Sequence, residues 1–535
     1  MATKKASAKK TTSKKVAVKP AAGTGRAQKS AADTPKERWT ILLDIAADGQ
    51  LANFGIESLK QLRNSVCQQV GRTDTAEVKV VAQFSIDAPA GQTIPRYIFK
   101  DCKKGDSLSN YVADYLDAPV DMTEREALID FLRWALQLEE QALQHGEWAA
   151  DHYALILWGH GPELLMQPPP AQGNGSVNLY LTPADLRSAV QEVIPLPNKA
   201  RKLDLIAFDA CSMSMFEVAY ELRDCARYMF ASQEEVPDLS FPYDTIVPMF
   251  RQYGAEATLE KLLQGGVYKY VQAYQDYINS DDTDMKPATL SALRLSKCDA
   301  LKEALCRLSA ALIAAKGEPA LPSVLLKARE YAGDFVSGLY VDLADFAAEL
   351  IAALDATTGL DLRMLMNQSP SAGNPDSWKC PIRQACCDIL NALTEDTTLE
   401  NKELLVLANS SVDADANGVS LYLPYLSNDE WAGLNRPMVK GGDATRGGKD
   451  FSSVLNDVSP QQLLCERRAL IATTESYYDA LQLSRDTGWY RFIVEQWTPI
   501  LVTIAAKDLD VLYSAKQAAL NAFGRKATAS PCTPT

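Results

Sequence analysis

The sequence is poor in histidine and lacks the paired cysteines that many zinc sites use. Its 535 residues include only three histidines, and none of its eleven cysteines forms a Cys-x-x-Cys pair. Zinc sites built on that spacing are therefore unsupported. No run of acidic residues has the spacing of an EF-hand loop either. We predict no metal site and no required cofactor.

Long apolar segments are also missing. No run approaches the ~20 apolar residues that a membrane-spanning helix needs. The N-terminus is rich in Lys, Ala and Thr and has no apolar stretch behind it, which is not the pattern of a secretory signal. We therefore expect a cytoplasmic protein whose cysteines are reduced.

Charge is distributed unevenly along the chain. Residues 1–36 carry about +9, whereas the whole chain carries −14. This basic segment has no aromatic residues and no apolar periodicity, so we expect it to be disordered. It is either a solubilising tail or a segment that touches nucleic acid or anionic membrane non-specifically. The acidic remainder argues against nucleic acid as a specific partner.

Strands alternate with helices in the first half of the chain. Short apolar runs predict strands, and apolar residues at helical spacing predict helices. The expected strands are 39–49, 77–86, 95–99, 153–159, 202–210 and 227–232, and the expected helices are 123–145, 182–194 and 212–224. Thr182 and Pro183 are typical of a helix start. The alternation predicts an α/β fold with a mostly parallel sheet flanked by helices.

The second half is richer in helix. Helices are expected at 256–279, 298–315, 320–335 and 341–354, a strand that returns to a sheet at 419–424, and amphipathic stretches over 460–524. The predicted organisation is a disordered tail (1–36), a catalytic core (37–250), a helix-rich continuation (251–425), a C-terminal subdomain (426–525) and a second disordered tail (526–535).

Two chemically active residues directly follow buried strands. His160 follows the strand 153–159, and Cys211 follows the strand 202–210. Catalytic groups collect at the carboxyl ends of strands in open α/β sheets. A single Cys is usually a packed thiol, and a single His beside glycines is usually a loop residue. The pair, 51 residues apart and each at a strand end, favours a Cys–His dyad.

The surroundings of Cys211 suit a nucleophile. The pattern Ser214-x-x-Glu217 predicts a capping box at the start of the next helix, which would lower the pKa of a nearby thiol. His160 would accept the thiol proton and later protonate the leaving amine. The backbone N–H groups of Gly161 and Cys211 are the predicted oxyanion hole.

At this point the sequence resembles the clostripain family of cysteine peptidases. The similarity is highest in FDACSMSMFEVAYELRDCARYMFASQEEVP (208–237), and WGHG (158–161) is similar to the family's catalytic-histidine motif. Four further segments are similar to family landmarks in the same order: WTILLDIAADGQL (39–51), YVDLADFAAEL (340–350), NGVSLYLP (417–424) and YYDALQLSRDTGWYRFI (477–493). The resemblance implies a caspase-like fold and a cysteine endopeptidase.

Roles for individual residues follow from the resemblance. It implies that Cys211 is the nucleophile and His160 the base. It also implies that Asp209 forms an acidic pocket for the substrate residue before the cleaved bond (P1), with cleavage after Arg or Lys. A carboxylate at this place pairs well with a basic side chain. Asp238 is a second pocket candidate, with a surface turn residue as the alternative.

The chain departs from the family pattern in two places. The family continues its histidine motif as HG-x-G-W, whereas here Pro162–Leu165 follow Gly161. The resemblance also implies self-cleavage after a basic residue between the histidine and the cysteine. The loop 162–186 has no Lys or Arg for this cleavage, which leaves Lys199, Arg201 and Lys202 as candidate sites. Some family members respond to calcium, although no motif supports calcium dependence here. The alternative hypothesis is a catalytically silent or proenzyme-like module that acts by protein binding.

The resemblance also bears on partners. It implies protein or peptide substrates. One hypothesis is an intracellular partner, such as a pore-forming protein, that is activated by cleavage. A third hypothesis is a nucleic-acid-associated protein that acts through its basic tail.

Overall fold

A computed structural model of the protein describes most of the chain between Lys36 and Leu501. The described residues are 36–47, 51–67, 74–86, 93–100, 103, 105–117, 124–145, 150–161, 181–237, 240–278, 288–335, 340–355, 378–393, 405–411, 416–425 and 481–501. The two predicted disordered tails lie outside this part apart from Lys36, as does most of the predicted C-terminal subdomain.

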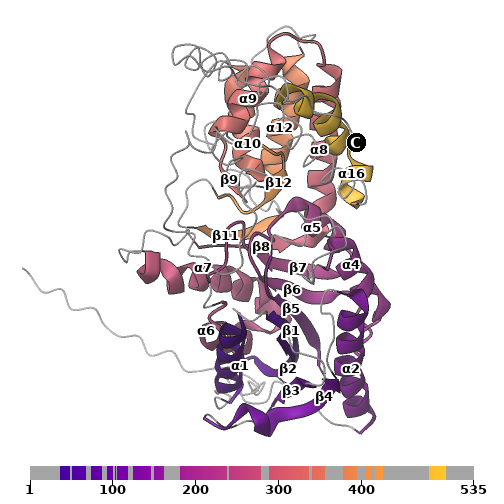
Figure 1. The fold of residues 1–535 in the computed structure, drawn as a ribbon, viewed down its shortest axis with the longest axis vertical. Helices are drawn as coiled ribbons and strands as arrows, with labels where there is room; N and C mark the ends of the chain where they lie inside the picture. Colours follow the sequence, from indigo (N-terminus) through magenta and orange to yellow (C-terminus); the bar gives the residue numbers. More distant parts are fainter. Residues whose placement is uncertain are drawn as a thin grey trace, which may run out of the picture. The chain divides into compact units, whose positions relative to one another are not determined.

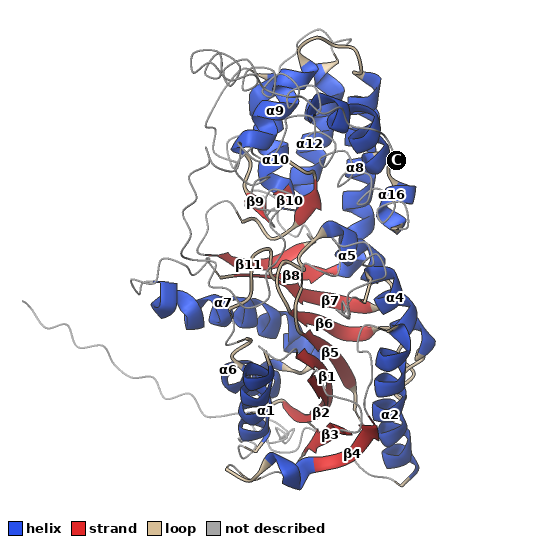
Figure 2. Ribbon diagram, in the orientation of Figure 1, coloured by secondary structure: helices blue, strands red, loops and turns tan. Residues whose placement is uncertain are grey.

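A nine-stranded sheet forms the centre of the fold (Figures 1 and 2). Its strands lie in the order β11-β8-β7-β6-β5-β1-β2-β3-β4. In chain order they are β1 (Glu37–Ala47), β2 (Ala76–Ile86), β3 (Thr93–Phe99), β4 (Val112–Asp117), β5 (His152–Trp158), β6 (Leu203–Asp209), β7 (Ala226–Ala231), β8 (Thr289–Arg294) and β11 (Val406–Ser411).

The strand directions confirm the predicted α/β class. The five adjacent strands β2, β1, β5, β6 and β7 are parallel. Antiparallel strands extend the sheet at both edges, with β3 and β4 on one side and β8 and β11 on the other. The result is a mostly parallel central sheet flanked by helices, as the alternation of strands and helices predicted.

Both faces of the central strands are buried, which explains why they are continuous apolar runs in the sequence. Leu155 and Ile206 belong to the apolar cluster that includes residues of α2, α4 and α5. Their neighbours Ala154 and Leu205 belong to the cluster that includes residues of α1, α6 and α7. Successive side chains of a strand point to opposite faces. The two helical layers therefore share the same strands.

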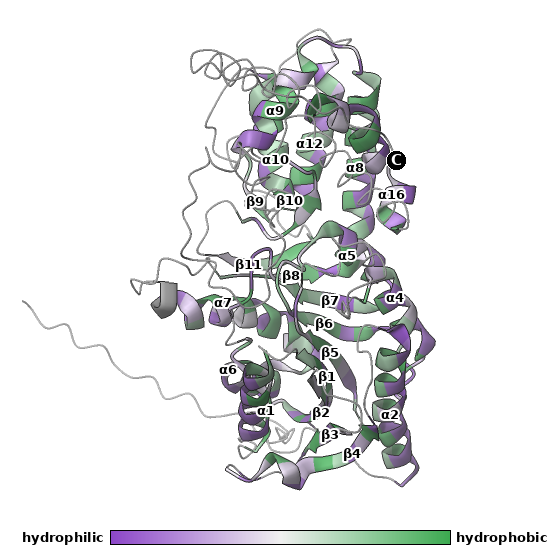
Figure 3. Cartoon of the chain, in the orientation of Figure 1, coloured by the Kyte–Doolittle hydropathy of each residue, from purple (hydrophilic) through white to green (hydrophobic). Residues whose placement is uncertain are grey.

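The helices α1 and α2 carry one buried and one exposed face, whereas every residue of α5 is buried. In Figure 3, α1 and α2 show both hydrophobic and hydrophilic residues, as surface helices do. In the first half the helices are α1 (Ala52–Val66), α2 (Arg125–Gln144), α4 (Pro183–Glu192), α5 (Phe216–Leu222), α6 (Tyr243–Tyr253) and α7 (Leu259–Ile278). Thr182 and Asp185 form a capping box at α4, so the helix start predicted at Thr182 is confirmed.

A second, three-stranded antiparallel sheet lies among the helices of the second half. It consists of β9 (Asp334–Phe335), β10 (Tyr340–Asp342) and β12 (Ser420–Tyr422), in the order β12-β10-β9. The helices there are α8 (Cys298–Ala314), α9 (Leu321–Tyr331), α10 (Leu343–Leu354), α12 (Lys379–Leu393), α16 (Gln482–Asp486) and α17 (Trp489–Phe492), followed by a π-helical turn at Ile493–Trp497. The strand predicted at 419–424 therefore joins this small sheet, while β8 and β11 complete the central one.

One cysteine differs from the expectation of reduced thiols. Cys67, which directly follows α1, is disulfide-bonded. The thiols of Cys225, Cys298 and Cys386 are free and buried, as expected for small apolar side chains. In the described part of the chain, no helix has the length and apolar character needed to cross a bilayer.

Replacing Ile206 with Ala tests the two-faced burial of the sheet. Ile206 lies in β6 and is fully buried. The substitution should lower the free energy of unfolding by roughly 2–5 kcal/mol, because it leaves a cavity in a packed core. Urea unfolding measures this change. The control is Tyr268→Ala on α7, where the side chain is 60% exposed and little change is expected. Equal effects of the two substitutions would contradict the described burial.

Candidate active site

The register of two adjacent strands brings the predicted dyad together. β5 and β6 are parallel neighbours, and Trp158 pairs with Asp209. Beyond the last pair, the backbone N–H of Gly159 donates to the carbonyl oxygen of Asp209 at 3.2 Å. Two residues further along each strand stand His160 and Cys211. The separation of 51 residues seen in the sequence is therefore the offset of this parallel pairing.

Gly161 lies directly against the backbone of Cys211. A Cβ atom added to Gly161 would stand 2.5 Å from the backbone nitrogen of Cys211 and still closer to its carbonyl oxygen. No side chain fits at that distance, so only glycine allows the two chain segments to approach this closely. The contact places the loop after β5 beside the nucleophile candidate.

A small cavity lies at this end of the sheet. Its volume is about 60 Å³. His160, Cys211 and Asp209 all line it, although they come from two different strand ends. The full lining is Leu51, Trp158, Gly159, His160, Asp209, Cys211, Val236, Pro237 and Ser240. His160 is exposed and Cys211 is half-buried, so both side chains are accessible from this opening.

The backbone turns sharply after Cys211. Ser212 has a φ of 52°, in the left-handed region that residues other than glycine rarely adopt. Ser212 N–H donates to Glu234 O at 2.9 Å, which holds the turn against the segment after β7. From the same segment, the backbone N–H of Val236 donates to Cys211 Sγ at 3.3 Å. Such outliers often accompany functional sites because the surrounding contacts must hold them in place.

The predicted capping box at Ser214 and Glu217 is wrong. The helix α5 begins at Phe216, and its N-cap is Met215, which makes no side-chain cap. Ser214 Oγ instead donates to Gly418 O at 2.6 Å, and Glu217 Oε1 accepts from Tyr422 N–H at 2.9 Å. Both side chains bind a distant segment, and neither caps α5.

Asp209 is a buried carboxylate with polar neighbours. Its Oδ2 accepts from the hydroxyl of Tyr243 at 2.7 Å and from Ser240 Oγ, and both oxygens accept from Phe241 N–H at 3.1 Å. Burial raises the pKa of Asp209 to about 6, against the effect of these hydrogen bonds. Among the described residues, no Lys or Arg pairs with it. The ionised form of this acid therefore has no basic partner within the part of the chain that the structure describes.

The other sequence candidates give a mixed outcome. Asp238 lies outside the described residues, so its place in the pocket stays a prediction. Val236 and Ser240 line the cavity but were not singled out as site residues. Val236 lies in the segment 208–237 that resembles the family, and Ser240 lies three residues beyond it, close to the pocket candidate Asp238. This closeness in sequence is the signal that could have identified them. Their contacts with Cys211 and Asp209 depend on tertiary structure alone.

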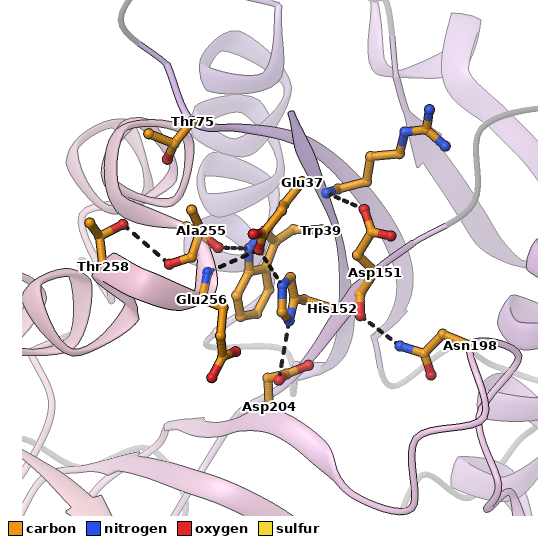
Figure 4. Close-up of polar contacts among 12 residues, drawn as sticks. Glu37, Trp39, Thr75, Asp151, His152, Asn198, Asp204, Ala255, Glu256 and Thr258 are labelled. Atoms are coloured by element: carbon orange, nitrogen blue, oxygen red, sulfur yellow. Dashed lines mark hydrogen bonds and ion pairs between the residues drawn. The ribbon is translucent and has the colours of Figure 1, made fainter. Parts of the chain in front are cut away.

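A second cluster of ionisable groups lies at the other end of β5 (Figure 4). His152 Nε2 is 2.6 Å from a Glu37 carboxylate oxygen, and His152 Nδ1 is 3.2 Å from Asp204 Oδ1. The ring stacks on Trp39, with 4.8 Å between ring centroids. Burial lowers the pKa of His152, but the hydrogen bonds and charges of Asp204 and Glu37 outweigh this and raise the pKa to about 9.

This cluster does not have the properties of a metal site. His152, Asp204 and Glu256 offer ligand atoms within 4.8 Å of one another. However, Arg227 already pairs with Asp204 at 3.0 Å and with Glu256 at 2.6 Å. A protonated His152 has no lone pair for a metal. The cluster is therefore a network of ion pairs that joins β1, β5, β6 and β7 at the strand starts.

Comparisons with known proteins identify the family of the chain. The sequence model of the clostripain family matches residues 45–425. The chain therefore belongs to the clostripain family, a family of cysteine peptidases. The comparison with curated proteins found no match.

Solved structures of cysteine proteases are also similar to the chain. One is a secreted C11 cysteine protease from Bacteroides thetaiotaomicron in complex with an irreversible peptide inhibitor. It has 18% identity and a TM-score of 0.46, and the match covers 74% of this chain and 94% of that one. Another is an inactive zymogen C11 protease from Parabacteroides distasonis. It has 16% identity and a TM-score of 0.43, with coverage of 73% and 93%.

Replacing His152 with Gln tests the ion-pair network. A raised folded-state pKa stabilises the fold fully below pH ~6.5, and this contribution is lost as pH rises through about 9. His152→Gln should lower the free energy of unfolding at pH 6 by about 2 kcal/mol and have less effect at pH 10. Urea unfolding at both pH values measures this. His145→Gln, at the exposed end of α2, is the control. A loss independent of pH would contradict the network.

Proposed function

We propose that the protein is a cysteine endopeptidase with Cys211 as nucleophile and His160 as general base. The observation that carries the proposal is the pairing of β5 with β6, which places both residues on one cavity. A thiolate attacks a peptide carbonyl best when a positioned imidazole takes its proton. The membership of the clostripain family supports the same reaction.

The proposed reaction has two stages. His160 accepts the proton of Cys211, and the sulfur attacks the peptide carbonyl to form a tetrahedral intermediate. His160 then protonates the leaving amine, which departs and leaves an acyl group on the sulfur. Water releases this group in the second stage, with His160 again as base. The N–H groups of Gly161 and Cys211 are the proposed donors to the oxyanion, supported by the close approach of the two backbones.

A preference for Arg or Lys at P1 is the second part of the proposal. Asp209 lines the same cavity as the dyad, and its charge has no basic partner among the described residues. A substrate cation would supply that partner. Among the described residues, only Phe241 N–H donates to Oδ1, which leaves this oxygen acceptor capacity for an incoming side chain.

The alternative of a proenzyme-like module rests on one contact. Val236 N–H donates to the sulfur of Cys211, so the segment after β7 lies against the nucleophile. Self-cleavage at Lys199 or Arg201 is compatible with the structure, since both are exposed in the turn before β6. Lys202 is a poorer candidate because its ammonium donates to Arg223 O at 2.7 Å.

Other expectations stay predictions. Calcium dependence, the absence of a required cofactor and a partner such as a pore-forming protein rest on sequence reasoning alone. So does the cytoplasmic location, and the disulfide of Cys67 weighs against it, because disulfides persist mainly in oxidising compartments.

Removing the nucleophile tests the reaction. Cys211→Ala should lower kcat/KM for a fluorogenic Arg or Lys peptide by at least ~10³-fold, since the proposed acyl enzyme forms on the sulfur of Cys211. The matched control is Cys306→Ala, a half-buried free cysteine on α8 that does not line the cavity. The control should retain activity. Equal activity of the two variants, with wild-type turnover, would refute the proposal; no turnover by any form would favour the alternative.

The pH dependence of P1 selectivity tests Asp209. Two peptides are compared, one with Arg and one with uncharged citrulline at P1. Ionisation of the dyad affects both rates and cancels in the ratio of their kcat/KM values. Protonation of Asp209 removes the attraction for Arg only, so this ratio should fall as pH drops below about 6. In Asp209→Asn the ratio should be low and independent of pH. A wild-type ratio near one at all pH values would contradict the assignment.

A further inference from the structure

We propose that Asp342 is a positioning residue for the turn that follows Cys211, and this inference rests on the proposed catalytic role of Cys211. Asp342 ends β10 in the small sheet, far along the chain from the nucleophile. Its side chain nevertheless connects to residues 212–214 by two paths, each made of hydrogen bonds and short backbone segments. Both paths reach the backbone of residues 212–214.

Asp342 is a fully buried carboxylate whose two oxygens accept four hydrogen bonds. Oδ1 accepts from Asp345 N–H at 2.9 Å and from Asn417 Nδ2 at 3.2 Å. Oδ2 accepts from Gln233 Nε2 at 2.9 Å and from Asn417 N–H at 2.7 Å. Only the bond from Asp345 is the N-cap of α10. The other three bind segments from elsewhere in the chain, so the residue does more than cap a helix.

The first path runs through Gln233. This buried residue lies just after β7, and its Oε1 also accepts from Gly418 N–H. The carbonyls on either side of Gln233 hold the turn after Cys211. Ser232 O accepts from Ser214 N–H at 2.8 Å, and Glu234 O accepts from Ser212 N–H at 2.9 Å. Fixing the side chain of Gln233 therefore fixes the two acceptors that hold the strained turn.

The second path runs through the segment that leads into β12. Asp342 binds both the backbone and the side chain of Asn417. The next residue, Gly418, accepts from Ser214 Oγ at 2.6 Å, and Ser420 N–H donates to Ser214 O at 2.8 Å. In Figure 1, β12 accordingly lies near α5, the helix that follows the turn. The second half of the chain thus binds the turn after Cys211, in addition to the segment after β7.

Geometry explains why this matters for catalysis. Ser212 has a left-handed φ, so the turn keeps its conformation only while neighbouring groups hold it. A displacement of about 1 Å at a reacting group can cost on the order of 10²-fold in rate. Asp342 would therefore affect the reaction without touching substrate. Its substitution should lower kcat while KM changes little.

The experiment compares two buried carboxylates. Asp342→Asn keeps the size of the side chain but replaces one acceptor oxygen with an NH₂ donor. This NH₂ group would face another donor, either Gln233 Nε2 or an N–H group of Asn417, and the hydrogen bond there would be lost. Glu139→Gln is the matched control. Glu139 on α2 is also fully buried and accepts from Thr40 Oγ1 at 2.9 Å and Ala150 N–H at 3.0 Å. It differs from Asp342 in forming a buried ion pair with Lys79, and it does not line the cavity. Both variants should lose thermal stability.

Three readouts separate positioning from stability. They are Tm, the kinetics on an Arg-coumarin peptide well below Tm, and the rate at which iodoacetamide alkylates Cys211, followed by peptide mass. Asp342→Asn should lower kcat at least tenfold and change the alkylation rate severalfold. Glu139→Gln should leave both near wild type. Gln233→Met should reproduce the effect, and the double variant Asp342→Asn/Gln233→Met should be no worse than the stronger single variant.

Each result that differs from these expectations has its own interpretation. Unchanged kcat and alkylation in both Asp342→Asn and Gln233→Met would overturn the positioning role. Equal loss of kcat in the Glu139 control would also overturn it. If Asp342→Asn does not fold, the kcat and alkylation rate of Gln233→Met alone decide whether the positioning role holds. If Cys211→Ala retains wild-type turnover, the proposed function fails, while the alkylation rates still test whether Asp342 shapes the turn.

Discussion

The parallel ladder between β5 and β6 is the interaction on which the site depends. Backbone hydrogen bonds fix its register, and that register sets Trp158 opposite Asp209. His160 and Cys211 come together because each follows its strand by two residues. A slip of one residue would turn the side chains of a strand to the other face, and burial of both faces forbids it. The apolar layers on either side therefore hold the geometry of a polar site.

Two buried carboxylates accept hydrogen bonds from segments that are distant in the sequence. Asp209 binds the segment from Ser240 to Tyr243, whose first residue lines the cavity. Asp342 binds the segments on both sides of the catalytic turn. Burial raises the pKa of each to about 6, because a charge is costly away from water. A buried carboxylate destabilises the fold unless its oxygens accept several hydrogen bonds. The hydrogen bonds that satisfy these two carboxylates also fix the neighbouring segments, which favours a role in shaping the site.

Regular local patterns made much of the fold predictable. The apolar runs of β1, β5 and β6 and the capping residues of α4 gave strand and helix positions within a few residues. Elements with weaker patterns were missed, among them α6, which contains Pro248, and the edge strand β11, whose residues are mostly half-buried. The capping box at Ser214 was wrong because its polar side chains found partners some 200 residues away, and those partners leave no mark in the local sequence.

The sequence by itself determined the class of the fold, the family and the two residues of the proposed dyad, since periodicity, strand ends and short motifs are local properties. Tertiary structure decided which strands are neighbours, how Gly161 meets Cys211, and which carbonyls hold the turn at Ser212. It also showed that Val236 and Ser240 line the cavity, and that Asp342 accepts hydrogen bonds from Gln233 and Asn417. Hydrogen bonds between distant segments cost chain entropy and form only once the apolar layers have packed. Their partners are therefore set by the whole fold.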